Sequence, residues 1–317
     1  MESVAYDVAS GWRLTHDLDV FLGRAGEFLR SRPAMHTVPL TVTDALRRRG
    51  MDGYGKEAPV FGFLEREGAV RATLFRTPPY PLNLTPLSEE DTDVLAALLA
   101  DLGHSPSGVF GDRDTTAAFA EAWQRRTGAT VTLRERQRLY RLGTLTPHEP
   151  APPGRARVAT EPDRARLAQW YGEFAEIIGE DGSRDSGAWA DDRLSYGGAT
   201  LWETPDGTPV SMAGRTDLIA GQIRVAPVYT AAHLRGRGYA GAATAEVSRA
   251  ALAAGADEVL LFADLANPTS NGLYQRLGYR PVVDFATYDF TADVADDVTA
   301  DDVTADGAAD VTATAAP

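Results

Sequence analysis

The segment HLRGRGYAGAAT, from His233 to Thr244, constrains the fold of this chain more than any other. Its glycines stand directly before an alanine-rich stretch, Gly238–Ala254, that has the composition of a helix. A strand of the buried type, with VLLFA at its centre, follows at Glu258–Asp264. Free N–H groups at the start of a helix point toward one anion, and the helix dipole adds a favourable potential. The segment therefore predicts a phosphate-binding turn.

The spacing of this turn fits two kinds of phosphate ligand. G-x-G-x-x-G, from Gly236 to Gly241, is the spacing of a dinucleotide-binding turn. Asp264 ends the next strand, and dinucleotide-binding domains have an acidic residue near that position. R-x-x-G-x-A, from Arg235 to Ala240, is the spacing of a turn that holds the pyrophosphate of coenzyme A. Two features oppose the dinucleotide. The preceding link, TAAHLR, is too long and polar for a strand that enters a tight turn, and three predicted strands come before the unit.

A proline-rich connector, TPHEPAPPG at 146–154, divides the chain into residues 1–145 and 155–290. Both parts mix helical and strand patterns, which predicts two α/β domains with mixed sheets (α+β type). From 291 to 317 the chain repeats ADDVT and carries seven Asp, with no Lys, Arg or aromatic residue. Such a segment cannot bury enough apolar surface to fold, so we expect a disordered acidic tail.

The periodicity of apolar residues predicts the individual elements. In 77–86, TPPYPLNLTP is too rich in proline for a central strand, and 130–142 is one long strand or two short ones. The other helices are expected at 17–31, 89–102, 115–127, 163–178, 188–196 and 271–277, and the other strands at 60–64, 70–76, 155–159, 200–203, 209–215, 222–230 and 281–290.

Composition excludes several functions. The chain has no cysteine, so disulfides, thiolate metal sites and a cysteine nucleophile are excluded. Its five histidines show no metal-ligand spacing. The net charge of −14, half of it in the tail, argues against nucleic acid as a partner. The sequence has no apolar run long enough to span a membrane and no signal peptide at its start, which predicts a cytoplasmic protein with no membrane partner.

A second motif follows the glycine turn. It reads Asn267-x-x-Ser270-x-x-Leu273-Tyr274, with Gly278-Tyr279 after it. Together, in this order, the two motifs resemble those of the GNAT superfamily of acyl-CoA-dependent N-acetyltransferases, and the resemblance covers 155–290. The predicted order β-α-α-β-β-β-α-β-α-β also resembles the GNAT fold. Three positions depart mildly from the family pattern: Thr230 replaces an aliphatic residue, Ala232 a proline and Ser270 an alanine.

The resemblance implies acetyl-CoA as a co-substrate and no metal. The strand 222–230 would diverge from the strand 258–264, and the pantetheine arm would lie in the gap. It would pair with backbone groups of Val228 and Thr230, and Asn267 would hold it, with Asn271 on or near the cofactor. The pyrophosphate would lie on the amides of Arg235, Gly236, Arg237, Gly238, Tyr239 and Ala240.

The same resemblance places Tyr274 beside the sulfur. A phenol of pKa near 10 suits a thiolate leaving group of pKa about 8.5 or higher, so Tyr274 is the candidate general acid. The alternative is an aromatic packing residue at a helix end. A backbone amide near Val228 or Tyr229 is expected to polarise the thioester carbonyl. The general base stays open among Glu173, Glu176, Glu203, Asp217 and Asp264, and the acceptor wall is expected among Trp170, Tyr171, Phe174 and Trp189.

These residues predict an enzyme that transfers an acetyl group from acetyl-CoA directly to a primary amine of a small molecule. The alternatives are a non-catalytic acyl-CoA sensor or partner subunit on the same fold, and a protein-modifying acetyltransferase. Residues 1–145 carry neither motif and are interpreted as a degenerate copy of the same fold, which would build part of the acceptor cleft or an internal pseudo-dimer rather than bind a second cofactor. The acceptor, the acyl length and the oligomeric state are not fixed by the sequence.

Overall fold

A computed structural model describes residues 6–7, 11–179 and 185–291. The tail predicted to be disordered lies outside these residues, apart from its first position. The N-terminal half contains β1 (Tyr6–Asp7), β2 (Trp12–Thr15), α1 (Leu18–Ser31), α2 (Thr37–Arg49), β3 (Val60–Arg66), β4 (Ala69–Arg76), β5 (Leu82–Leu84), α3 (Glu89–Asp101), β6 (Gly108–Asp112), α4 (Arg113–Thr127) and β7 (Thr130–Leu142).

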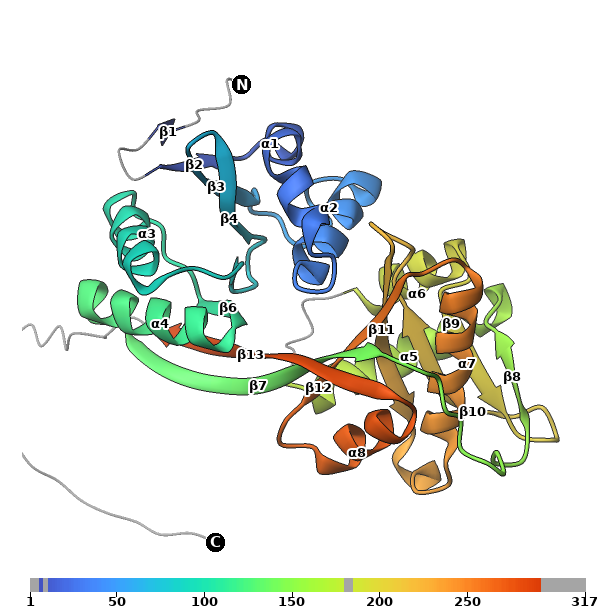
Figure 1. Ribbon diagram of the computed structural model, residues 1–317. Coiled ribbons are helices and arrows are strands. Elements are labelled where there is room, and N and C mark those ends of the chain that lie inside the picture. The colour runs from blue at the N-terminus through green and yellow to red at the C-terminus, as the bar shows by residue number, and fades with distance from the viewer. Residues whose placement is uncertain (1–5, 8–10, 180–184, 292–317) are drawn as a thin grey trace, which may run out of the picture.

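The connector 146–154 carries no helix or strand and leads into the C-terminal half (Figure 1). Short 3-10 turns stand at Glu161–Asp163 and Ala232–Leu234. The remaining elements are β8 (Arg155–Val158), α5 (Arg164–Ile177), α6 (Ser186–Ser195), β9 (Ala199–Glu203), β10 (Pro209–Arg215), β11 (Gln222–Thr230), α7 (Tyr239–Ala253), β12 (Glu258–Asp264), α8 (Pro268–Arg276) and β13 (Tyr279–Thr291).

All described strands join one mixed sheet in the order β1-β2-β3-β4-β5-β6-β13-β7-β12-β11-β10-β9-β8. The two long strands β7 and β13 pair antiparallel at its centre, as Figure 1 shows. Each strand has crossed into the other half. β13 lies between β6 and β7, and β7 lies between β13 and β12. The mixed α/β fold class predicted from the sequence is confirmed.

The two halves repeat one order of elements. From β2 to β7 the order is β-α-α-β-β-β-α-β-α-β, and from β8 to β13 it is the same. In both halves the fourth and fifth strands of this series, β5 with β6 and β11 with β12, pair in parallel. A duplicated domain would produce this repetition. The degenerate-copy interpretation itself stays a prediction.

One expectation about the N-terminal half was wrong, and one helix there was missed. The proline-rich segment 77–86 does contain an interior strand, because its proline-free centre Leu82–Leu84 pairs with β4 on one side and β6 on the other. The helix α2 was not predicted, since Thr and Val interrupt its periodicity and Pro39 lies within it. Proline is tolerated there because the first turn of a helix needs no intrahelical N–H donor.

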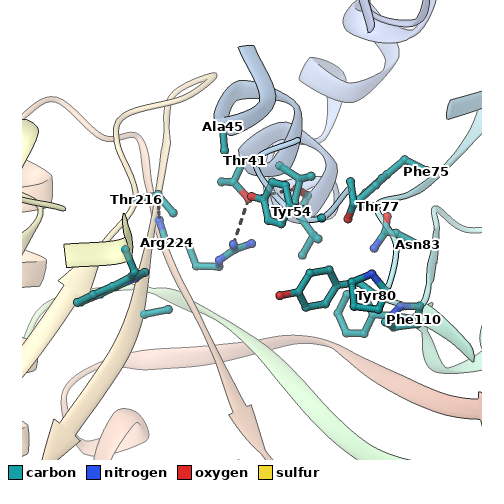
Figure 2. A pocket seen from close by; sticks show the side chains of 18 of the residues that line it. Thr41, Ala45, Tyr54, Phe75, Thr77, Tyr80, Asn83, Phe110, Thr216 and Arg224 are labelled. Atoms are coloured by element: carbon teal, nitrogen blue, oxygen red, sulfur yellow. Dashed lines mark hydrogen bonds between the residues drawn. The ribbon is translucent and has the colours of Figure 1, made fainter. Parts of the chain in front are cut away.

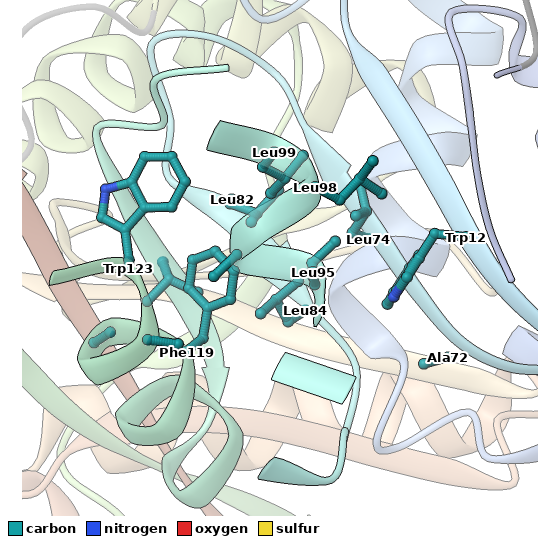
Figure 3. Packing of buried hydrophobic residues seen from close by; sticks show 14 of the residues in the cluster. Trp12, Ala72, Leu74, Leu82, Leu84, Leu95, Leu98, Leu99, Phe119 and Trp123 are labelled. Atoms are coloured by element: carbon teal, nitrogen blue, oxygen red, sulfur yellow. The ribbon is translucent and has the colours of Figure 1, made fainter. Parts of the chain in front are cut away.

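Each half has its own apolar core. In the N-terminal half α3 and α4 cover the sheet, and Trp12, Phe119 and Trp123 pack with a set of leucines (Figure 3). The corresponding core of the C-terminal half lies between α7, α8 and the sheet. Within the described ranges, no helix combines the length and apolar character that crossing a membrane requires.

The helix α2 connects the two halves. Thr37 Oγ1 donates to Gln222 Oε1 on β11 at 3.0 Å, and Arg224 Nη2 donates to Thr41 Oγ1 at 3.0 Å. Farther along α2, Arg48 and Arg49 form ion pairs with Asp192 on α6 at 3.1 and 2.7 Å. These contacts hold α2 over the opening between the halves.

Candidate active site

The strands β11 and β12 pair over only three residues and then diverge. Their parallel register runs from Gln222↔Glu258 to Arg224↔Leu260. Beyond this point β11 pairs with β10, and β12 continues to Asp264 along β7. After Arg224, the facing edges of β11 and β12 are therefore no longer hydrogen-bonded to each other, and no other strand lies between them. This is the gap expected from the sequence, and Val228 and Thr230 lie along it.

The glycine turn closes the open end of this gap. Arg235 Nε donates to the carbonyl of Thr230 at 3.0 Å, which fixes the start of the turn against the end of β11. Gly236 and Gly238 have φ of +76° and +82°, a left-handed backbone that favours glycine. A Cβ on Gly236 would meet no atom within 4 Å, so the backbone angle rather than lack of space requires glycine there.

The helix α7 begins directly after this turn, and its N-terminus is suited to an anion. Gly238 is the N-cap and provides no side-chain acceptor, and the first turn contains no acidic residue. The first amides of a helix have no intrahelical partner, so those of Tyr239 and Ala240 face outward with those of the turn. Arg237, His233 and the turn are exposed. The residues present therefore fit a pyrophosphate.

The second motif forms the start of α8, directly after β12. Asn267 is the N-cap, and its Oδ1 accepts from Ser270 N at 3.0 Å, which leaves its amide nitrogen free to donate. Asn271 has a different environment. Its Nδ2 donates to the carbonyls of Asp264 and Asn267, and its Oδ1 accepts from Tyr140. Asn271 therefore fastens α8 to the sheet, and its amide group has no hydrogen left for a cofactor.

Tyr274 lies inside the core beneath α7. Its ring meets that of Tyr279 edge to face at 6.1 Å between centroids, and its side chain is 8% exposed. Burial raises the pKa of Tyr274 to about 12. In the part of the chain that the structure describes, its hydroxyl has no hydrogen-bond partner, whereas the Tyr279 hydroxyl bonds to Ser248 Oγ at 2.7 Å. Tyr274 is thus a core residue whose hydroxyl is not engaged by any described part of the protein.

The equivalent region of the N-terminal half is closed. A Cβ on Gly111 of β6 would lie 2.6 Å from the carbonyl oxygen of Leu84, so β5 and β6 stay together where β11 and β12 diverge. The helix α3 begins with the side-chain cap Ser88, followed by Glu89, Glu90 and Asp91. These carboxylates repel an anion. Only the C-terminal half therefore has both the gap and the anion site.

A cavity of about 980 Å³ lies between the two halves. Arg224 and Ala226 on β11 and Phe262 on β12 line this cavity. The closed end of the β11–β12 gap therefore lies at the cavity wall. Figure 2 shows Arg224 on one side of the space and Tyr80 and Phe110 on the other. From the wall predicted for the acceptor, Tyr171, Phe174 and Trp189 line the cavity, whereas Trp170 is buried in the core against Tyr229.

The comparisons with known proteins agree with this geometry. The family described as FR47-like protein matches residues 213–288, which span both motifs. A GNAT-family acetyltransferase from Colwellia psychrerythraea superposes with a TM-score of 0.55 at 12% identity, covering 92% of this chain and 99% of the other. The chain has the GNAT fold.

Two further solved GNAT structures cover most of the chain. A GCN5-related N-acetyltransferase from Sphaerobacter thermophilus has a TM-score of 0.53 at 18% identity and covers 82% of this chain and 93% of its own. A tandem GNAT protein from the clavulanic acid biosynthesis pathway has a TM-score of 0.51 at 11% identity, with coverage of 85% and 94%. No curated protein matches the sequence. The GNAT resemblance inferred from the two motifs is confirmed.

The five carboxylates considered as the general base differ in their burial and in their hydrogen-bond partners. Glu203 is buried in ion pairs with Arg157 and Arg155 at the far edge of the sheet. Glu173 accepts from Tyr229 on β11, and that hydrogen bond lowers the pKa of the Glu173 carboxyl. None of the five candidates lines the cavity, including the remaining three, Glu176, Asp217 and Asp264.

A carboxylate that the sequence did not single out lines the cavity instead. Glu135 lies on β7, in the N-terminal half of the chain, and is half-buried. Burial raises the pKa of its carboxyl group. Its position in the cavity wall depends on the pairing of β7 with β13, where Glu135 is in register with Thr287, and no local pattern in the sequence predicts that pairing. Within the described residues, no group of three or more His, Cys, Asp or Glu is arranged to hold a metal ion.

Proposed function

We propose that this chain is an N-acetyltransferase that moves an acetyl group from acetyl-CoA directly to a primary amine of a small molecule. The observation that carries the proposal is the gap between β11 and β12. One end of it meets the outward amides of the turn at Gly236–Ala240, and the other meets the cavity at Ala226. A thioester in that gap would present its carbonyl to an acceptor held between the halves.

The residues of the site suit direct transfer. As the C–N bond forms and the C–S bond breaks, the amine nitrogen loses two protons from its ammonium form. One proton ends on the thiol and the other in solvent. A phenol is protonated at neutral pH, and burial raises the pKa of Tyr274 further, to about 12, so its hydroxyl is a proton donor for the leaving thiolate. The chain has no cysteine for a thioester intermediate.

The shape of the cavity favours a small acceptor over a protein. It lies between α2, α6 and the central strands, and the ion pairs from Arg48 and Arg49 to Asp192, all three of which line it, join one half to the other. A folded protein surface would have to open these contacts to present a lysine, whereas a small amine would not. The sensor alternative uses the same donor site and differs only in lacking turnover.

Calorimetric titration of acetyl-CoA and, separately, of NADH into residues 1–291 tests the donor site. We expect acetyl-CoA to bind and NADH not to bind. Gly236→Ala is expected to weaken acetyl-CoA binding by about tenfold or more, because a residue strained at positive φ displaces the amides of the turn. NADH binding alone would show a dinucleotide turn and remove the proposal.

A matched control separates binding from stability. Gly207, in the β9–β10 turn, has φ of +85°, and a Cβ there also meets no atom within 4 Å. Gly207→Ala is expected to cost as much stability as Gly236→Ala and to leave acetyl-CoA binding unchanged. Equal weakening by both variants would mean that the Gly236 effect is only a loss of stability.

A further inference from the structure

A row of four side chains crosses the floor of the cavity. The strand registers are Asn83↔Phe110 between β5 and β6, Phe110↔Thr287 between β6 and β13, and Thr287↔Glu135 between β13 and β7. All four residues line the cavity. Adjacent strands are about 4.8 Å apart, so the row is about 14 Å long at the backbone. It offers an amide, an aromatic ring, a hydroxyl and a carboxylate, in that order.

The carboxylate at one end of this row forms no direct ion pair within the described residues, although Arg134, next to it in the chain, attracts it electrostatically while pairing with Asp289. Glu135 accepts only from neutral donors, Gln137 Nε2 at 3.1 Å and Thr287 Oγ1 at 3.4 Å. The other carboxylates of the cavity wall have different environments. Asp192 is paired with three arginines and Asp289 with Arg134. Asp185 caps α6, and Asp52 is exposed to solvent. A half-buried carboxylate without a direct ion pair favours a cation in the space in front of it.

The amide at the other end is also without a protein partner. Asn83 is 5% exposed, and its side chain forms no hydrogen bond within the described ranges. The Asn83 amide lines the cavity and is not one of the enclosed polar atoms without a partner, so it is available to hydrogen-bond a ligand or an ordered water. Figure 2 shows Asn83 near Phe75, Tyr80 and Phe110. These rings suit an apolar, planar body between the two polar ends.

We infer that the row Asn83–Phe110–Thr287–Glu135 binds the acceptor, and that the acceptor is a primary amine on an aromatic body with a polar group at its far end. Glu135 takes the ammonium group, Phe110 contacts the ring and Asn83 hydrogen-bonds the distal group. The row lies mostly in the N-terminal half, so that half provides acceptor specificity while the C-terminal half holds the donor. The inference rests on the proposed function, which makes the cavity the acceptor side.

Tyramine is a suitable probe because it has an ammonium, a ring and a distal hydroxyl. Its matched neutral analogue is tyrosol, in which a hydroxyl replaces the ammonium, and 2-phenylethylamine lacks the distal hydroxyl. Calorimetric titrations of the three compounds are made into the chain saturated with coenzyme A. Glu135→Gln, which keeps the volume and can keep both hydrogen bonds, is expected to weaken tyramine about tenfold to hundredfold and to leave tyrosol unchanged.

The distal end is tested first without any substitution. In the wild-type protein tyramine is expected to bind more tightly than 2-phenylethylamine, and Asn83→Ala is expected to remove most of that difference. Glu121→Gln, on the outer face of α4, is the control, because Glu121 does not line the cavity. It should change none of the three affinities.

The outcomes separate the two proposals. If coenzyme A binds but tyramine does not, or if Glu135→Gln affects tyramine and tyrosol equally, the acceptor row is wrong and the donor site stands. If coenzyme A does not bind, the proposed function fails, and the row loses its role as an acceptor site whatever tyramine does. Selective loss of tyramine in Glu135→Gln, with the control unchanged, supports the row.

Discussion

Tyr274 and Tyr279 are neighbouring buried tyrosines with different uses. The hydroxyl of Tyr279 is held by Ser248 within the core, and that of Tyr274 has no such partner among the described residues. The sequence motif contains both tyrosines and does not distinguish their roles. Burial raises the pKa of Tyr274 to about 12, so this group stays a proton donor up to high pH. The free hydroxyl, rather than the motif alone, supports Tyr274 as the acid.

Replacing each tyrosine by phenylalanine separates catalysis from packing. Tyr274→Phe is expected to lower kcat about 10²-fold to 10⁴-fold, the contribution of a positioned acid, and to leave the affinity for acetyl-CoA unchanged. Tyr279→Phe loses a buried hydrogen bond and is expected to cost about 1 kcal/mol of unfolding free energy with little effect on kcat. Steady-state rates, titration and urea unfolding measure these quantities. Unchanged turnover in Tyr274→Phe would favour another acid or the sensor alternative.

At the scale of elements, local patterns predicted most helices and strands correctly. The strands β3 and β4 were expected, and Glu67 and Gly68, which form the turn between them, both have positive φ. The strands β10, β11 and β12 have the predicted limits. The failures have physical causes. β5 is a strand of only three residues whose neighbours complete its hydrogen bonds, and β6 and α2 have no clear apolar period.

A partly buried ion pair holds the 3-10 turn that precedes α5. Asp163 is 8% exposed, accepts from Arg157 Nη1 and Nη2 at 2.6 and 2.7 Å, and also accepts from Thr160 N at 2.8 Å. The hydrogen bonds from Arg157 lower the pKa of Asp163 to about 2. A lowered folded-state pKa stabilises the protein above the unfolded value near 3.9, and this stabilisation is lost as the pH falls through about 2.

Asp163→Asn is therefore expected to lower the unfolding free energy by about 1–3 kcal/mol at pH 7. The difference from the wild type should shrink as the pH falls from about 4 to about 2, because Asp163 itself becomes protonated there. Urea unfolding at several pH values measures it. Asp191→Asn is the control, since its pair with Arg164 is exposed and should contribute little. A difference that stays constant down to pH 2 would contradict this assignment.

At the scale of the whole molecule, the exchange of β7 and β13 was not predictable from local sequence. The connector at 146–154 indicates two independent units, and within the described residues neither half completes its sheet alone. The strand partners of β7 are β12 and β13, both from the C-terminal half. Those of β13 are β6 and β7, both from the N-terminal half. Pairing across such a sequence distance leaves no signal in periodicity, and for the same reason Glu135 was missed.

The exchange predicts that the halves fold only together. Residues 1–145 alone would expose both edges of β7, and residues 155–291 alone would expose both edges of β13, and such edges promote aggregation. We expect each fragment to be insoluble or to lack a cooperative unfolding transition, and the co-expressed pair to purify as a 1:1 complex that binds acetyl-CoA. Size-exclusion chromatography and titration, with the intact chain 1–291 as control, measure this. A cooperatively unfolding monomer of either fragment would show that the exchanged strands are not required for that half to fold. The acceptor row, which spans both halves, would then form by docking of two folded halves.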